Sequence, residues 1–205
     1  MPSSNSQFHR TQTQLTPPLL PQVSGASSHA VETWNIDRLT IGSVIARNVG
    51  ECGLLLQTTT NAKVGLVDGS NAGAGTGYAT LRMANRNGRK SDGSYSTNVY
   101  VDKVVSRGGG RGIFCVSESG GAQITNVDLA DNGGNAILIE NCYGLKINGG
   151  KVNGGGEIRV AARSEFANTK DVAVTLRADN VAVRESPCGS NIDWNISGNA
   201  KLSVC

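Results

Sequence analysis

Residues 122–141 read AQITNVDLADNGGNAILIEN, and this stretch decides the fold. It joins two short segments rich in Val, Ile and Leu through a polar corner of Asn and Gly. The same phrase returns, with changes, at 39–58, 62–84, 98–118 and 143–162, and in a degenerate form at 171–185. Repetition every ~20–30 residues is typical of solenoid proteins, in which stacked copies bury a shared core.

The copies align on one apolar residue in the middle of the second segment. These residues are Leu54, Leu81, Ile113, Ile137 and Ile158, with spacings of 27, 32, 24 and 21 residues. Apolar and polar residues alternate around them, which on a strand places one set inward and the other outward. Cys115 alternates with Ile113, so we expect it to point inward as a small apolar side chain.

Glycine and asparagine gather at the corners. Asn-Gly-Gly occurs at 132–134 and at 148–150, and both residue types tolerate the positive φ angles that tight corners need. The glycine-rich stretch 106–112 resembles an RNA-binding segment, but we interpret it as another corner. A β-sandwich also has short strands and turns, yet whole phrases need not repeat in it. We therefore predict an all-β fold, a right-handed parallel β-helix of about six to seven coils.

The composition argues against several classes of protein. The 205 residues include 27 glycines, aromatic residues make up 4%, and the formal net charge is +3. Apolar runs last only a few residues, so we expect no membrane span. The small net charge gives no reason to expect a nucleic-acid partner. No Cys-x-x-Cys pair indicates a zinc site. We expect a monomer.

The chain changes character near residue 33. Residues 1–32 hold four of the five prolines and both histidines, so we predict a disordered tail there. The β-helix domain is expected over 33–205, with a C-terminal cap at about 186–205. Cys188 and Cys205 can form a disulfide that fixes this end, which fits an oxidising compartment. We expect an extracellular protein, although the tail does not read as a signal peptide.

Three copies resemble coils of a known superfamily. VIARNVGECGLLL (44–56), VVSRGGGRGIFCV (104–116) and VDLADNGGNAILIENC (127–142) look like coils of the right-handed parallel β-helix of the pectin-lyase-like superfamily. The resemblance covers about residues 33–185 and implies a protein that acts on polysaccharides. Its enzymes include lyases and glycosidases of acidic and cell-wall glycans, and its tail-spike and adhesin-like members are non-catalytic.

The signature motifs of these enzymes are absent from this sequence. A polygalacturonase would show Asn-Thr-Asp, Asp-Asp, Gly-His-Gly and Arg-Ile-Lys, and a pectate lyase would show Arg-x-Pro-x-x-Arg. The sequence contains none of them, and no histidine follows residue 32. We therefore transfer no catalytic residue from these families.

The candidate site comes from outward positions beside the aligned row. Arginine there can hold the carboxylate of an acidic glycan through paired hydrogen bonds. Cleavage by β-elimination further needs a base for the C5 proton and an acid for the leaving oxygen. We assign substrate binding to Arg82, Arg159 and Arg163. The candidate catalytic residues are Arg111, Glu118, Glu140 and Tyr78.

The carboxylates leave other functions open. If Glu118 and Glu140 occupy equivalent positions in adjacent copies, they can hydrolyse a glycoside or, with Asp128 and Asp131, bind Ca²⁺. A shift of register would separate them. The residues demand no cofactor, and Ca²⁺ is the candidate metal. All of these side chains can also be ordinary solvated residues on a solenoid. A non-catalytic carbohydrate-binding surface protein and a truncated remnant of an enzyme are the alternatives to a polysaccharide-cleaving enzyme.

Overall fold

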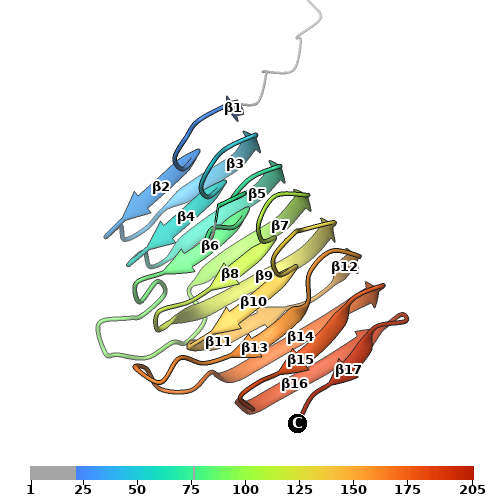
Figure 1. Cartoon of the computed structure of the whole chain (residues 1–205). Coiled ribbons are helices and arrows are strands. Elements are labelled where there is room, and N and C mark those ends of the chain that lie inside the picture. The colour runs from blue at the N-terminus through green and yellow to red at the C-terminus, as the bar shows by residue number, and fades with distance from the viewer. Residues whose placement is uncertain (1–21, 76) are drawn as a thin grey trace, which may run out of the picture.

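The computed structural model describes residues 22–75 and 77–205 as a parallel β-solenoid of about eight turns (Figure 1). Each turn places a strand in each of two sheets, sheet A and sheet B, and the strands within each sheet pair in parallel. No helix occurs in these residues, and hence none that could cross a membrane. The predicted all-β solenoid is confirmed, while its right-handed winding stays a prediction from the general preference of parallel crossovers.

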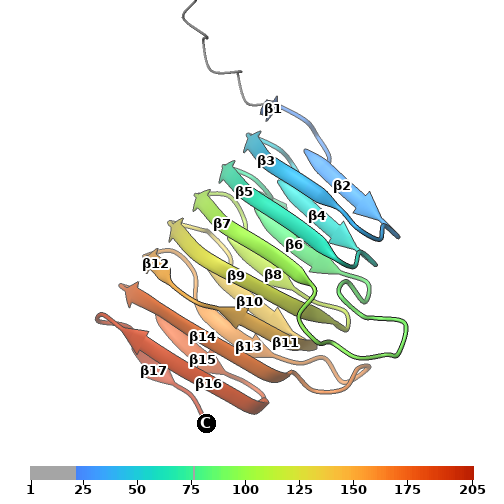
Figure 2. The ribbon, with the colours of Figure 1, turned by 180° about the vertical axis from the view of Figure 1, so that it is seen from behind.

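The two sheets lie on opposite sides of the core, with sheet B nearer the viewer in Figure 1 and sheet A nearer in Figure 2. Sheet A contains β1 (Gln22–Ser24), β3 (Thr40–Arg47), β5 (Ala62–Ser70), β7 (Val99–Arg107), β9 (Ser119–Ala130), β11 (Cys142–Ile147), β12 (Gly150–Asn153), β14 (Lys170–Asp179) and β16 (Ser190–Ser197). Sheet B contains β2 (Val31–Trp34), β4 (Leu54–Gln57), β6 (Leu81–Ala84), β8 (Ile113–Cys115), β10 (Ile137–Glu140), β13 (Ile158–Ala161), β15 (Ala182–Glu185) and β17 (Lys201–Ser203).

The strand register of sheet B confirms the alignment of the repeats. Leu54 pairs with Leu81, Leu81 with Ile113, Ile113 with Ile137, and Ile137 with Ile158. All five side chains point inward and are fully buried. A single copy has no partner for this apolar face, so the stacked rows supply the burial that stabilises the fold.

One corner of every turn has the same backbone conformation. The residue directly after each sheet-A strand has a φ angle between 51° and 98°. It is always Gly, Asn or Asp, the residues that reach this left-handed region at least cost. These positions are Gly25, Asn48, Asn71, Gly108, Asp131, Gly154, Asn180 and Gly198. The stretch 148–150 is not a corner as predicted, because it lies between β11 and β12 and Gly150 pairs with Val127 in sheet A.

The glycine-rich corners stack closely on one another. Gly110 N–H donates to the Ala72 carbonyl oxygen, and Gly134 N–H donates to that of Gly110. A Cβ at Gly110 would overlap the carbonyl oxygen of Gly73. Glycine is therefore required here because the next turn leaves no room for a side chain. This confirms the interpretation of 106–112 as a corner.

The solenoid is longer than the sequence indicated. β1 and β2 form a first turn from residues 22–34, most of which we had placed in the tail, and β16 and β17 form an eighth turn within the predicted cap. The first turn was missed because its strands are short and poor in apolar residues. The other residues of the predicted tail, 1–21, lie outside the described part of the chain.

Two disulfide bonds fix the turns. The predicted Cys188–Cys205 bond is present. Cys115 points inward as expected, but it is bonded to Cys142, which links β8 in sheet B to β11 in sheet A. Cys52 is free and fully buried.

Candidate functional site

The outer face of sheet B has an apolar centre. Leu55, Arg82, Phe114, Leu138 and Arg159 follow one another along a single outward row, one per turn. The three apolar members are only 4–6% exposed although they face away from the core. Long side chains from neighbouring positions therefore cover them, and two of those side chains are arginines.

Arg82 and Arg111 pack against the same ring. The guanidinium carbons lie 5.3 Å and 4.9 Å from the centroid of Phe114. Neither guanidinium forms a salt bridge with a carboxylate in the described part of the chain. Burial lowers the pKa of Arg111, the charge of Glu140 opposes this, and the charge of Arg82 adds to it. Two positive charges without an acidic partner suit an anionic ligand.

Tyr78 lies beside Arg82 and belongs to a cluster that the sequence did not reveal. Its ring centroid is 6.0 Å from the Arg82 guanidinium carbon. The Tyr78 hydroxyl donates a hydrogen bond to Glu51, which raises the pKa of Tyr78. Glu51 also accepts from Ser28 at 2.7 Å and lies 3.0 Å from His29 Nε2. Hydrogen bonds from Ser28 and Tyr78 lower the pKa of Glu51.

His29 was missed because we had assigned it to the tail. It belongs to the first turn, where its Nδ1 accepts a hydrogen bond from the Cys52 backbone N–H at 3.0 Å. Its ring also contacts Tyr78 edge-to-face, with centroids 5.8 Å apart. The solenoid thus does hold a histidine, and that histidine adjoins a predicted site residue. No motif in the sequence signals this contact, because it depends on how the first turn stacks.

Arg159 shares the row of Arg82 but lies three turns further along, a rise of about 14 Å. Its Nη1 is 3.6 Å from Glu157, and its Nη2 donates to the Ser186 carbonyl oxygen at 3.1 Å. Arg184, the next residue in the row, also pairs with Glu157. One carboxylate is thus shared by two arginines, and this part of the face keeps a positive balance.

The expected equivalence of Glu118 and Glu140 is wrong. Strand β10 pairs with β8 at an offset of 24 residues (Ile139 with Cys115), but β11 pairs with β9 at an offset of 23 (Cys142 with Ser119). Glu140 is therefore level with Val116, while Glu118 lies in the corner that follows, at φ 56°. This one-residue slip is the shift of register that separates them.

Each of these two carboxylates has its own arginine. Arg86 Nε lies 2.9 Å from Glu118, and Arg163 Nε lies 3.0 Å from Glu140. Arg163 also donates to the Ser117 hydroxyl at 3.2 Å, so it links the two corners. Arg163 and Glu140 thus lie together at one edge of the face, whereas Arg82, Arg111 and Tyr78 form the centre of the site.

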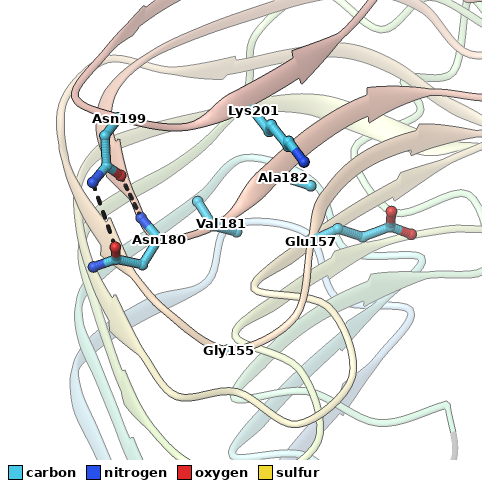
Figure 3. Close-up of a pocket in the computed structure, with 7 residues that line it drawn as sticks. All are labelled: Gly155, Glu157, Asn180, Val181, Ala182, Asn199 and Lys201. Carbon is cyan, nitrogen blue, oxygen red and sulfur yellow. Dashed lines mark hydrogen bonds between the residues drawn. The ribbon is translucent and has the colours of Figure 1, made fainter.

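Two surface hollows accompany the site. One, of about 390 Å³, lies beside Glu118 and is lined by Thr58, Asn85, Arg86, Ser117, Glu118 and Phe166. The other, of about 490 Å³, lies near the C-terminal end of the solenoid (Figure 3). It is lined by Gly155, Glu157, Asn180, Val181, Ala182, Asn199 and Lys201.

The residues named for Ca²⁺ do not form a joint ligand set. Glu118 and Glu140 pair with different arginines, and Asp128 pairs with Arg107 at 2.8 Å. Across residues 22–75 and 77–205, the group of three potential metal ligands that lie close together is Glu185, Cys188 and Cys205. Two of these three form a disulfide.

Comparison with known proteins adds no family. No family model matches the chain, no curated protein is similar to it, and no solved structure matches it. The resemblance to the pectin-lyase-like superfamily therefore stays a prediction. A parallel β-solenoid is compatible with a carbohydrate-active protein, but function has to be argued from the site.

Proposed function

We propose that the protein binds an acidic polysaccharide on the outer face of sheet B, with Arg82 and Arg111 receiving one carboxylate. The observation that supports this most is the packing of both guanidinium groups against Phe114 without an acidic partner among the described residues. Like charges held close together repel each other, and a bound anion relieves that repulsion. A guanidinium presents two parallel donors that match a planar carboxylate.

The extent of the face favours a polymer over a small anion. Arg159 repeats the outward position of Arg82 about 14 Å further along the solenoid. A chain of uronate units that lies along the turns can meet both positions, whereas a single sugar acid cannot.

Cleavage by β-elimination is a second candidate function, and Tyr78 favours it. Its hydrogen bond to Glu51 keeps the phenol protonated beside Arg82. A protonated phenol can supply the proton that the leaving oxygen needs, while the arginines neutralise the carboxylate. Glycoside hydrolysis has less support, because Glu118 and Glu140 lie at different levels and each pairs with an arginine.

An extracellular location forms part of the proposal. The two disulfide bonds support an oxidising compartment. Asn195, in an Asn-Ile-Ser glycosylation sequon, is exposed on β16.

The binding proposal is tested by calorimetric titration of the purified protein with polygalacturonate, alginate, chondroitin and a neutral glucan. We expect the acidic polymers to bind and the neutral glucan not to bind. Arg82→Ala and Arg111→Ala should each weaken binding at least tenfold, because a hydrogen bond to a charged group contributes about 1.5–3 kcal/mol. Lys146→Ala is the matched control, since it removes one positive charge from the outer face of sheet A.

The outcome against the proposal is equally definite. Equal binding of neutral and acidic polymers, or an Arg82→Ala loss no larger than that of Lys146→Ala, would overturn it. The same mixtures are followed in the ultraviolet for unsaturated ends. Tyr78→Phe should abolish a rise in absorbance while binding persists. Binding without any such rise in the unaltered protein refutes the lyase function and leaves the binding function standing.

A further inference from the structure

A series of polar contacts leads from Arg111 toward the C-terminal end of the solenoid. Arg111 Nε donates to Asn135 Oδ1 at 3.2 Å, and Asn135 Nδ2 donates to Glu157 Oε1 at 3.4 Å. Glu157 in turn accepts two hydrogen bonds from Arg184, at 2.9 and 3.0 Å. The polar part of the outer face of sheet B therefore continues past the Arg82–Arg111 pair.

These contacts end beside the hollow shown in Figure 3. It lies where the four-residue corner 154–157 is followed by shorter corners of two and three residues, at 180–181 and 198–200. The hollow combines two side-chain amides, from Asn180 and Asn199, with the apolar side chains of Val181 and Ala182. Amides beside an apolar patch suit a sugar ring, which offers both hydroxyl and C–H groups.

Lys201 is the free positive group of this hollow. It opens β17, pairs in register with Ala182, and is exposed. It forms no salt bridge within the described residues, and the nearby Glu157 is already paired with Arg184. Asn199 Nδ2 donates to Asn180 Oδ1 at 3.4 Å, which leaves its second amide hydrogen available to a ligand.

We infer that this hollow is a second carboxylate subsite, in which Lys201 anchors a further acidic unit of the same polysaccharide. The inference rests on the proposed function of the Arg82–Arg111 pair. Arg111 directly precedes β8, in the fourth turn, and Lys201 lies in the eighth, a rise of about 19 Å. A disaccharide is too short to meet both subsites, whereas a longer oligosaccharide that lies along the turns engages both.

Oligogalacturonates of graded length test the inference. In calorimetric titrations of the full chain, Lys201→Ala should weaken binding of a hexasaccharide about fivefold, the upper effect of an exposed ion pair. Binding of the disaccharide should not change. Lys201→Arg should restore hexasaccharide binding, because it keeps the positive charge. Lys146→Ala again serves as the charge-matched control on sheet A.

The outcomes separate this inference from the proposed function. If Arg82→Ala weakens hexasaccharide binding but Lys201→Ala acts no differently from Lys146→Ala, the second subsite is refuted and the first stands. An equal loss for the disaccharide and the hexasaccharide would also refute it, since Lys201 would then act at the first subsite. If the protein binds neither oligosaccharide, the proposed function itself fails.

Discussion

Gly156→Ala probes how closely the corners of neighbouring turns stack. An added Cβ at this position would fall on the carbonyl oxygen of Gly134 in the turn before. Ordinary contact needs about 3.5 Å between such atoms. The two corners must therefore move apart, although the backbone φ of Gly156 is itself compatible with alanine.

The expected cost follows from the hydrogen bonds that this movement breaks. Gly156 N–H donates to the Asn132 carbonyl oxygen at 2.7 Å, and the Gly156 carbonyl oxygen accepts from Ala136 N–H at 3.3 Å. Each half-buried backbone group left without a partner costs about 1–2 kcal/mol. We therefore expect the substitution to lower the free energy of unfolding by about 2–4 kcal/mol.

Urea unfolding followed by tryptophan fluorescence measures this cost and locates it. Trp34 lies in the first turn and Trp194 in the eighth, so variants with a single tryptophan report on opposite ends. Stability in a solenoid is nearly a sum of turns and their interfaces. The Trp194 transition should thus shift more than the Trp34 transition, because Gly156 lies in the sixth turn.

Gly42→Ala is the control for this experiment. No atom lies within 4 Å of an added Cβ there, and the substitution should be neutral or stabilise the chain by up to ~1 kcal/mol. Equal stability of the Gly156→Ala and Gly42→Ala variants would refute the close stacking of corners.

Three further predictions concern cysteine and tyrosine. Burial raises the pKa of Cys52 to about 11, so the folded chain should show no thiol reactive to an aromatic disulfide reagent at pH 8, and one after unfolding without reductant. Replacing Cys115 and Cys142 together by Ala should cost about 3.5 kcal/mol in urea unfolding, from the entropy of the 27-residue loop. Burial raises the pKa of Tyr95 to about 12 from an unfolded value near 10, so its contribution is full below pH 10 and is lost as the pH rises toward 12. The free energy of unfolding should fall by about 1 kcal/mol over that range after allowance for solvent screening, and Tyr95→Phe should remove this dependence.

The repeat, the inward rows and the corner residues could be predicted from the sequence because they are local. Leu54 and Ile158 align by pattern alone, and strand register later pairs the residues between them one turn at a time. The same reasoning placed Arg82 and Arg159 in one outward row. Alternation fixes the direction of a side chain, so this part of the candidate site followed from the pattern.

Contacts between turns could not be predicted in the same way. The Cys115–Cys142 bond crosses a corner from one sheet to the other, and alternation within one strand does not identify such a partner. A one-residue change of offset after β10 separates Glu118 from Glu140. His29 reaches Tyr78 through a first turn whose strands have too few apolar residues to stand out.

The Cys115–Cys142 bond also decides how the molecule responds to force. Tension applied at the two ends of the chain peels turns away from each end of a solenoid, because each turn is held mainly by its neighbours. The segment between the bonded cysteines is shielded from that tension, since the load passes through the sulfur–sulfur bond. A fully extended oxidised chain is therefore shorter than the reduced chain by about 90 Å, the contour length of 27 residues. In this respect the solenoid is an extensible spring with a built-in stop near its middle.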